Sequence, residues 1–410
     1  MLTPQDVLTI LAGLGLFEAL RGHLPLQRSV RRARSGQPDR RDDLPPVTVI
    51  RPIKDLDHGL AENLEAALGY DYPAEVQTIF VLDDDRDPAY PLVAMAAERA
   101  RARGQDAIVL ECGEPPSGVT GKLHAMQAGL DVAKHGIVAF ADSDTRPGPT
   151  LLRDLVTPLV DDPSVGSTFA PVVVDQPLVT PSDAGYALML NGLYSPAARK
   201  EAGADGRLPF IMGQFMAFRR LTLEVIGGLE GTKGELVDDM NIGLRMHAQG
   251  YHNVMVETPM SIVQGELSLR EFDGVYRRWI AFSRRGLPLE FKLPLQLRAT
   301  LWWVLLLLGL AGFAGGAPLA GALGLLGVLV TGLSINRLHA EVGGQPLGWR
   351  LGWVVFALLL FSPYVYARVL LGRQVAWRGR VYQLDATAKL AHRAKEALLS
   401  GSFPSVEVRP

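Results

Sequence analysis

The stretch Ile137-Val-Ala-Phe-Ala-Asp-Ser-Asp144 places five apolar residues directly before two carboxylates. A short apolar run of this kind is typical of a buried β-strand. A helical pattern follows at Thr150–Leu159. Since ligands of parallel α/β sheets bind beyond the carboxyl ends of the strands, this acidic segment marks an edge where we expect a binding site.

The alternation of strands and helices extends through the middle of the chain. Further apolar, β-rich runs lie at Val47–Ile50, Val76–Leu82 and Ile108–Leu110, and helical patterns lie at Leu60–Leu68, Pro91–Arg103 and Lys122–Ala133. This order predicts an α/β fold with a mostly parallel sheet flanked by helices. We assign it to a domain of residues 45–286.

The composition of the whole chain excludes several other classes of protein. Of its 410 residues, 48% are hydrophobic and 20% are charged, which excludes a disordered chain. Lys and Arg total 41 against 43 Asp and Glu, a balance that argues against nucleic acid as a partner. Cys112 is the only cysteine, so neither a disulfide framework nor a Cys-based zinc cluster is possible.

A long apolar segment follows the α/β domain. Residues 299–335 contain no charged side chain. As one helix this segment would be about 55 Å long against a hydrocarbon core of about 30 Å, which predicts two spans with a turn near Gly315–Pro318. Before it, residues 287–298 mix apolar residues with isolated charges and two prolines, and we expect an interfacial connector there.

Two more apolar segments lie near the ends of the chain. Leu351–Leu371 is interrupted only by Arg368, and we expect α-helical transmembrane segments throughout residues 299–372. In residues 1–44 we expect an N-terminal membrane anchor and a basic linker. The apolar stretch there, Val7–Leu20, suits either a short signal anchor or an amphipathic surface helix. The chain is therefore predicted to be an integral membrane protein, with the lipid bilayer as a partner.

The distribution of positive charges conflicts with the number of apolar segments that could span the membrane. Five arginines lie between Arg21 and Arg34, and the tail of residues 373–410 is also basic. The excess of positive charge on the cytosolic side of membrane proteins predicts that both segments lie in the cytosol. Two spans in residues 299–335 and a third at Leu351–Leu371 would instead leave the tail outside. One of the apolar segments is therefore re-entrant or interfacial.

Carboxylates gather at three points: Asp83-Asp84-Asp85 after an apolar run, Asp142-Ser143-Asp144, and Asp238-Asp239 at the start of a helical pattern. A single acidic cluster is usually a solvated turn or a helix N-cap. Two clusters at the carboxyl ends of strands in one sheet face one crevice, and their repulsion favours a bound cation. Carboxylate oxygens suit Mg²⁺ or Mn²⁺, especially where substrate phosphates complete the shell. Since the chain has neither a P-loop nor a G-x-G-x-x-G motif after its first strand, we expect a diphosphate held by metal.

Seven segments occur in the order found in GT-A (family 2-like) glycosyltransferases. The chain resembles more narrowly the ceramide glucosyltransferases and their bacterial relatives that glycosylate lipids, including hopanoids. The segments are Val47–Lys54, Asp83–Ala89, Gly121-Lys122, Asp142-Ser143-Asp144, Gly213–Arg219, Asp238-Asp239 and Arg278-Trp279. Trp377–Arg380 and Tyr382 in the tail also resemble the family. The resemblance implies a GT-A nucleotide-sugar-binding domain joined to transmembrane helices.

The resemblance implies which residues bind the sugar donor. Pro52 and Asp84 would contact the base and ribose of a UDP-sugar, and Lys122 would lie near the donor. Asp142 and Asp144 would form the D-x-D motif that binds the donor and a divalent cation, Mg²⁺ or Mn²⁺. Asp144 is the preferred direct ligand of the metal.

The resemblance also implies the catalytic residues. Asp239 would be the catalytic base, and Arg278 with Trp279 would close over the donor diphosphate. Physical chemistry supports these roles, because an attacking hydroxyl needs a carboxylate to take its proton and a departing diphosphate needs cationic partners. The candidates for the acceptor pocket are Gly213, Gln214 and Asp238.

The sequence departs from the family at two points. The family's last motif usually begins with Gln or Arg three residues before its Arg-Trp pair; this chain has Val275 there, and Arg277 is the nearest replacement. Relatives often have Gln at the position of Asp83, so Asp83 and Asp84 are alternative candidates for the contact with the base and ribose of the donor. We assign that role to Asp84.

These observations predict a membrane-bound inverting glycosyltransferase that moves a sugar from a UDP-sugar to the hydroxyl of a ceramide-like membrane lipid. The reaction would take place on the cytosolic face of a bacterial inner membrane. Two other functions stay open: a polysaccharide synthase-like glycosyltransferase, and a non-catalytic membrane scaffold with a GT-A fold. The sugar and the acceptor lipid (ceramide, diacylglycerol or hopanoid) stay open as well.

Overall fold

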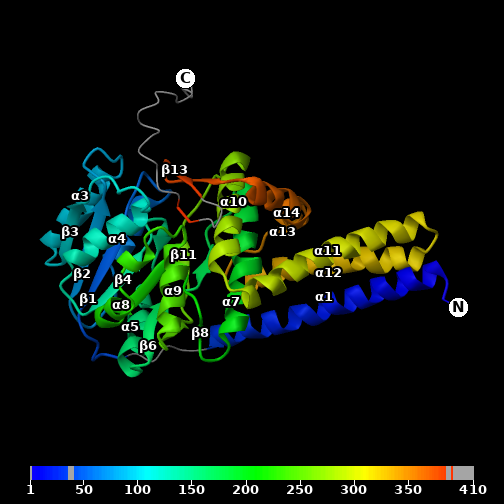
Figure 1. Ribbon diagram of the computed structural model, residues 1–410, viewed down its shortest axis with the longest axis horizontal. Helices are drawn as coiled ribbons and strands as arrows, with labels where there is room; N and C mark the ends of the chain where they lie inside the picture. The colour runs from blue at the N-terminus through cyan, green and yellow to red at the C-terminus, as the bar shows by residue number, and fades with distance from the viewer. Residues whose placement is uncertain (1, 36–40, 385–388, 391–410) are drawn as a thin grey trace, which may run out of the picture.

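The computed structural model describes residues 2–35, 41–384 and 389–390. An α/β domain forms one end of the molecule, and a bundle of long helices projects from it (Figure 1). The tail returns from the helices to the α/β domain. The remaining residues of the predicted basic tail, 385–388 and 391–410, lie outside the described residues.

Within the described residues, eight strands form the main sheet in the order β3-β2-β1-β4-β9-β6-β10-β8. Their bounds are β1 Val47–Pro52, β2 Val76–Leu82, β3 Asp106–Glu111, β4 Ile137–Ala141, β6 Val165–Phe169, β8 Arg207–Leu208, β9 Phe215–Arg219 and β10 His252–Met255. Strands β3, β2, β1 and β4 run parallel, and β10 is parallel to β6. Only β9 and the short β8 pair antiparallel with their neighbours. The predicted fold class is thus confirmed.

Helices cover both faces of this sheet because alternate residues of each strand point to opposite faces. Ile50 and Phe140 pack on one face, whereas Val49 and Ala139 pack on the other. The helices and helical turns of the domain are α2 Leu60–Ala67, α3 Tyr90–Ala102, α4 Gly121–Asp131, α5 Leu151–Asp161, α6 Pro181–Ala187, the π-helical η1 Leu188–Tyr194, α7 Ser195–Ala202, α8 Arg220–Val225, η2 Glu230–Thr232, α9 Asp238–Ala248 and α10 Leu269–Gly286.

A second, three-stranded sheet lies directly after the acidic segment of β4. It has the order β5-β11-β7, with β5 at Thr145–Arg146, β7 at Val172–Val173 and β11 at Met260–Ile262. Because β5 begins one residue after Asp144, this sheet fixes the direction in which the chain leaves the carboxyl end of β4.

Three long helices form the projecting bundle. They are α1 Pro4–Ser35, α11 Leu289–Ala314 and α12 Pro318–Val342. The turn predicted between two apolar spans is present between α11 and α12. Glycines allow these helices to pack closely: a Cβ on Gly312 would lie 2.4 Å from the backbone nitrogen of Gly321, and one on Gly324 would lie 2.5 Å from that of Gly309.

Two predicted membrane segments have different bounds in the structure. Helix α1 continues well beyond Leu20, because Leu26 and Val30 are buried against Leu338 and Val342 of α12. Most of the expected connector, residues 287–298, forms the first turns of α11, and the break in the chain comes at Leu287 and Pro288 between α10 and α11.

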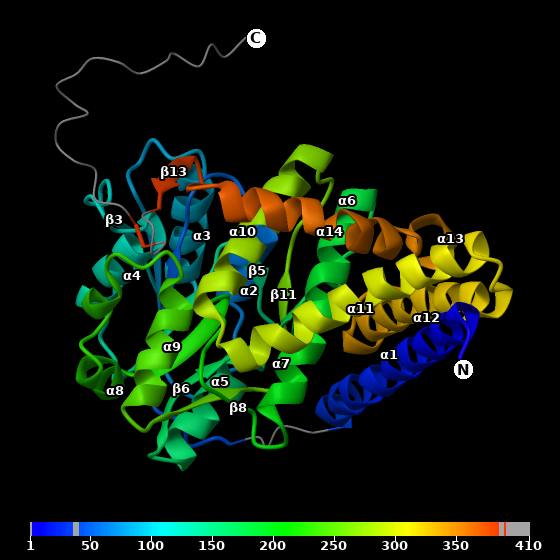
Figure 2. The same cartoon turned by 45° about the vertical axis from the view of Figure 1, so that its right-hand side comes forward.

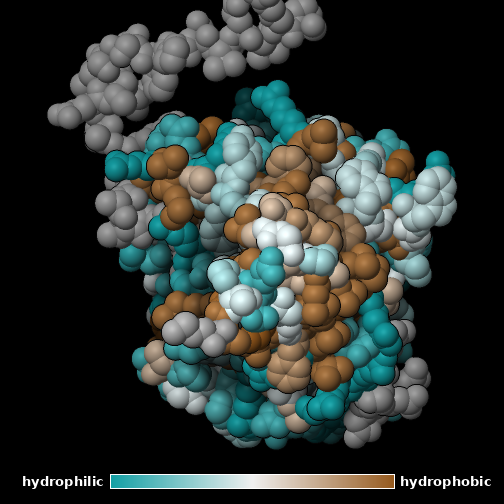
Figure 3. Space-filling model, turned by 90° about the vertical axis from the view of Figure 1, so that its right-hand side faces the viewer, coloured by the Kyte–Doolittle hydropathy of each residue, from teal (hydrophilic) through white to brown (hydrophobic). Residues whose placement is uncertain are grey.

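Four helical segments are long and apolar enough to cross a membrane: Pro4–Arg32, Leu289–Ala314, Pro318–Val342 and Gly348–Leu371. Viewed onto its far end, the bundle gathers hydrophobic side chains, while hydrophilic ones lie around them (Figure 3).

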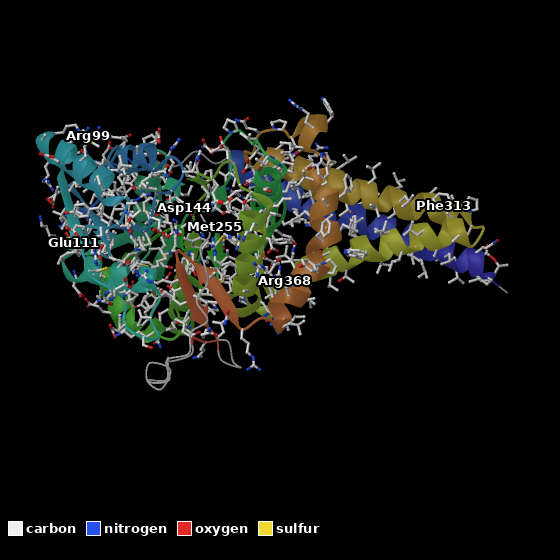
Figure 4. The ribbon with its side chains drawn as sticks, turned by 90° about the horizontal axis from the view of Figure 1, so that it is seen from above. Arg99, Glu111, Asp144, Met255, Phe313 and Arg368 are labelled. Carbon is white, nitrogen blue, oxygen red and sulfur yellow. The ribbon has the colours of Figure 1, made fainter. Side chains whose placement is uncertain are left out.

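The fourth of these segments has a different orientation. It comprises α13 Gly348–Leu351 and α14 Val354–Leu371, and α14 runs crosswise to the bundle at its base (Figure 4). Figure 2 shows α14 leading from the bundle toward the strands of the tail. Near its start, Asn336 of α12 donates a hydrogen bond of 2.8 Å to the carbonyl of Gly352. Near its end, Arg368 pairs with Asp273 of α10 at 3.2 Å.

Candidate active site

A cavity of about 430 Å³ opens at the carboxyl ends of the parallel strands. It is lined by residues of β1, α4, α9, α10 and the tail, and by residues that directly follow β2 and β4. Among them are Pro52, Lys122, Asp142, Asp144, Gln214, Asp238, Asp239, Arg278 and Trp279, which are candidate site residues from the sequence. Figure 4 shows Asp144 within the α/β domain, far from Phe313 at the distal end of the bundle.

Lys122 and Asp142 form a partly buried ion pair on one side of the cavity. Thr120 caps α4 by accepting a hydrogen bond from the backbone of Leu123, which fixes Lys122 in the first turn. The Lys122 Nζ lies 2.6 Å from an Asp142 oxygen and donates to the carbonyl of Gly213 at 3.1 Å. Burial raises the pKa of Asp142 to about 6 even though Lys122 opposes that shift.

The backbone of the D-x-D segment is held by Arg51, a fully buried residue of β1. Its Nη2 donates to the carbonyl oxygens of Asp142 at 2.7 Å and Thr145 at 2.9 Å. Arg51 therefore positions both carboxylates without facing the cavity itself. Sequence reasoning missed this role, because an arginine inside a β-strand run looks like an exposed residue of that strand.

Asp239 lies in the first turn of α9 and faces the same cavity. One of its oxygens accepts from the backbone nitrogen of Gly213 at 2.6 Å, and the other from that of Met240 at 2.8 Å. A Cβ on Gly213 would lie 2.5 Å from the carboxylate, so only glycine fits there. Burial and the charge of Asp238 raise the pKa of Asp239 to about 7, and Lys122 opposes them. A carboxyl with a pKa near neutrality is suited to accept and release a proton.

Arg278 and Trp279 lie on α10, which closes another side of the cavity. A capping box between Ser268 and Glu271 starts this helix. Trp279 packs against Tyr194 with ring centroids 5.6 Å apart. Arg278 is partly buried, and loss of contact with water lowers its pKa.

The departure from the family motif on α10 is not compensated by Arg277. Val275 lines the cavity. Arg277 pairs with Asp273 at 3.0 Å and does not line the cavity. The expectation that Arg277 replaces the missing polar residue is therefore wrong.

Asp83 and Asp84 have different surroundings in the structure. Asp83 is buried, lines the cavity and pairs with Lys54 at 2.9 Å. Asp84 instead pairs with the exposed Arg86 at 2.5 Å outside the cavity, and this hydrogen bond lowers its pKa. The preference for Asp84 is corrected accordingly: successive residues after a strand point in different directions, and only Asp83 points inward.

Gly213, Gln214 and Asp238 lie next to Asp239. Gly213 contacts the Asp239 carboxylate, while Gln214 and Asp238 line the cavity. Among the described residues, the Gln214 Oε1 and the Asp238 Oδ2 are buried oxygens that accept no hydrogen bond. Buried acceptors of this kind favour a ligand that brings donors or a cation.

The residues present fit a divalent cation only in part. In the portion of the chain that the structure describes, no group of three His, Cys, Asp or Glu side chains forms a metal site. Asp142 and Asp144 offer two carboxylates of the hard oxygen type that Mg²⁺ and Mn²⁺ prefer. These ions commonly take their remaining ligands from water and substrate phosphates, so this donor set fits a cation that binds together with a diphosphate.

Several known proteins resemble the chain. The sequence profile of Glycosyl transferase family 21 matches residues 7–390. The probable glycosyltransferase YdaM of Bacillus subtilis is 23% identical over 217 residues, 51% of this chain and 48% of that protein. The ceramide glucosyltransferase of Candida albicans is 28% identical over 123 residues, 28% of this chain and 22% of that protein. The chain thus spans about half the length, or less, of these curated relatives.

A solved structure supports the fold. The mannosyltransferase PcManGT from Pyrobaculum calidifontis, in complex with GDP-Man and Mn²⁺, superimposes with a TM-score of 0.51 at 20% identity. The match covers 87% of this chain and 99% of that one. Since the family profile covers most of the sequence, the chain belongs to glycosyl transferase family 21.

Proposed function

We propose that the protein is a membrane-bound inverting glycosyltransferase that moves a sugar from a nucleoside-diphosphate sugar, a UDP-sugar in the first instance, to the hydroxyl of a membrane lipid. One observation carries this proposal: Asp142, Asp144, Lys122, Arg278 and Asp239 converge on one cavity beside a bundle of apolar helices. The family and the ceramide glucosyltransferase among the relatives support it.

Asp239 would act as the base. Its carboxylate, held by the backbone of Gly213 and Met240, would take the proton of the acceptor hydroxyl. The acceptor oxygen then bonds to the anomeric carbon as the bond from that carbon to the phosphate oxygen breaks. A single displacement of this kind inverts the configuration of the anomeric carbon.

Cationic groups would stabilise the departing diphosphate. Lys122 and Arg278 line the cavity and are both partly buried. Charge interactions are stronger in such a site than in bulk water. A divalent cation held by Asp142 and Asp144 would neutralise further negative charge on the leaving group. For the base and ribose of the nucleotide we propose Pro52 and Asp83, the latter in place of Asp84.

A second cavity would receive the lipid. It has a volume of about 630 Å³ and lies between η1, α10, α11 and α14. Its lining is mostly apolar and includes Leu193, Tyr194, Ile280, Leu287, Leu358 and Leu370. Tyr194 touches Trp279 of the first cavity, so the two cavities adjoin through this aromatic pair. We propose that the apolar chains of the acceptor lie here while its hydroxyl reaches Asp239.

The helices would cross the membrane three times. We propose that α1, α11 and α12 span it and that α14 lies along its surface, because both ends of α14 contact segments beside the α/β domain. Trp353, directly before α14, and Tyr364 on α14 are exposed aromatic residues of the kind found at membrane interfaces. Three crossings leave the basic N-terminal linker and the tail on one side, the cytosol, which removes the conflict in the sequence. For a bacterial protein this membrane would be the inner membrane.

The test is release of nucleoside diphosphate by the purified protein in lipid nanodiscs. A panel of UDP-sugars and GDP-mannose would be combined with ceramide, diacylglycerol and a hopanoid, with and without Mn²⁺ or Mg²⁺. We expect release that needs one donor, one lipid and the metal, and that falls about 10²- to 10⁴-fold in Asp239→Asn. Asp205→Asn, which changes an exposed carboxyl that does not line the cavity, is the matched control. A protein that binds no nucleoside diphosphate would refute the proposal and favour the scaffold.

A further inference from the structure

The tail forms part of the wall of the first cavity. Strands β12 Gln374–Trp377 and β13 Arg380–Gln383 make a two-stranded hairpin, which we call the tail hairpin. Five of its residues line the cavity, although they lie about a hundred positions beyond α10 in the sequence: Ala376, Trp377, Arg378, Arg380 and Tyr382.

The sequence Trp377-Arg-Gly-Arg380 builds the tip of the hairpin. Trp377 pairs with Arg380, which leaves Arg378 and Gly379 as a two-residue turn. Their φ angles are 49° and 70°, and positive values at both positions are those of a type I′ turn. Glycine adopts this conformation freely, whereas arginine does so at a cost. A strained arginine at the tip indicates that its side chain is needed there.

The hairpin is anchored on both sides of the cavity. The Trp377 ring packs edge-on against Phe282 of α10 with centroids 5.9 Å apart. The Tyr382 hydroxyl accepts a hydrogen bond of 3.2 Å from the backbone of Gly121 at the start of α4. Arg380 bridges Asp83 at 2.6 Å and Glu114 at 2.8 Å. A Cβ on Gly121 would lie 2.4 Å from the Arg380 guanidinium, so the glycine before Lys122 leaves room for this arginine.

Arg378 reaches into the acidic centre of the cavity. It pairs with Asp57, donates to the carbonyl of Lys54 at 3.2 Å, and places Nη2 3.6 Å from an Asp144 oxygen. The same nitrogen lies 3.5 Å from the Ser143 hydroxyl.

The contacts of Arg378 are those expected of a residue that binds the diphosphate, and not those of a permanent structural ion pair. Asp142 already has Lys122 as its partner, and the longer contact of Arg378 with Asp144 is the one that a metal ion would replace. A guanidinium released from Asp144 would face the phosphate oxygens that complete the shell of the metal. Arginine binds phosphate through two parallel N–H donors, which a lysine does not offer.

We propose that the tail hairpin is a wall of the donor site and that Arg378 binds the diphosphate of the nucleotide sugar. This inference rests on the proposed function, since it needs a nucleotide-sugar donor in the first cavity. It adds a cationic residue from the end of the chain to Lys122 and Arg278. It also explains why the tail has to return to the α/β domain after α14.

The test measures binding by the full chain in nanodiscs with Mn²⁺ present. UDP and GDP are the probes, and uridine and guanosine are matched probes without phosphates. Arg378→Ala is expected to weaken binding of the preferred diphosphate about 10- to 100-fold and to leave nucleoside binding unchanged. Arg378→Lys should fall between Arg378→Ala and the unchanged protein. Arg373→Ala removes an exposed arginine just before the hairpin and should bind as the unchanged protein does.

The outcomes separate this inference from the proposed function. If the unchanged protein binds neither diphosphate, the proposed function fails. If it binds one and Arg378→Ala binds that diphosphate equally well, the inference is wrong and the function stands. Tighter binding by Arg378→Ala also overturns the inference, because the hairpin would then be an inhibitory contact.

Hydrogen exchange provides a readout that needs no variant. In the unchanged protein, amides of residues 374–383 should exchange more slowly when UDP and Mn²⁺, or GDP and Mn²⁺, are bound. Exchange that stays the same or becomes faster in the bound protein would contradict the inference even if Arg378→Ala failed to fold.

Discussion

At the scale of single residues, the site depends on carboxyl groups whose surroundings differ sharply. Asp142 is paired with Lys122, whereas Asp239 is held by two backbone amides beside a second carboxylate. The D-x-D segment and Asp239 could be predicted from the sequence, since acidic residues follow a strand or open a helix. Arg51 and Arg378 could not, because their roles depend on which distant backbone each guanidinium reaches.

The raised pKa of Asp239 predicts how the rate depends on pH. If Asp239 is the base, as we propose, it must be ionised, and burial together with Asp238 raises its pKa to about 7. The rate should therefore be highest above pH 7 and fall about tenfold for each pH unit well below it. The measurement is kcat between pH 5.5 and 8.5 at saturating donor, lipid and metal. A rate that stays constant over this range would mean that Asp239 does not take the proton.

Asp83 and Asp84 provide a test within one acidic cluster. Asp83 lines the first cavity, whereas Asp84 pairs with Arg86 outside it. Asp83→Asn should weaken nucleotide binding about tenfold, because it removes a charged hydrogen-bond acceptor from the cavity. Asp84→Asn should leave the Kd unchanged. Equal effects of the two substitutions, measured by calorimetry with the preferred diphosphate, would contradict the corrected assignment. The sequence could not separate these neighbours, because the direction of each side chain depends on how the chain leaves β2.

At the scale of elements, length and hydropathy identified the apolar helices but not their orientation. The turn between α11 and α12 was predictable from the absence of charges and from the glycines and proline near residue 316. The crosswise course of α14 was not, since its composition equals that of a spanning helix. Its orientation depends on contacts at its ends with α12 and α10, which are remote in sequence.

The proposed topology of three crossings predicts which residues share a side of the membrane. In a Cys112→Ser background, Trp349→Cys introduces a thiol before α14, and Leu371→Cys introduces one at the last residue of α14. The two native side chains are 88% and 86% exposed. Both thiols should react with a membrane-impermeant maleimide only from the side of the α/β domain. Ala314→Cys, at the end of α11, should react only from the opposite side. Labelling of positions 349 and 371 from opposite sides would show that α14 crosses the membrane.

At the scale of the whole molecule, the fold joins a polar cavity to an apolar one. The α/β domain supplies the strand-end carboxylates, α10 supplies the arginine and tryptophan, and the long helices supply the second cavity. The α/β order was readable from the sequence because strands and helices have different periods. The joining of the two cavities through Tyr194 and Trp279 was not, because no local pattern marks a contact between η1 and α10.

Because the two cavities are separate, a substitution in the second cavity should change the KM for the lipid alone. Ile280→Trp adds volume inside the second cavity, which should compete with the lipid and raise its KM about tenfold. The Kd for the nucleotide should not change, because the proposed donor site is the other cavity. Leu307→Trp, on the exposed face of α11, is the matched control. An unchanged KM for the lipid in Ile280→Trp would mean that the acceptor binds elsewhere.

The anomeric configuration of the product tests most directly whether the protein transfers a sugar to a lipid by a single displacement. A donor labelled with ¹³C at the anomeric carbon, with its sugar α-linked, would be incubated with the protein and the preferred lipid. A single displacement predicts a ¹³C NMR signal of a β-glycoside in the lipid fraction, which disappears in Asp239→Asn. An α-linked product would contradict the single displacement. Free labelled sugar in the water phase, with none on the lipid, would contradict transfer to a lipid.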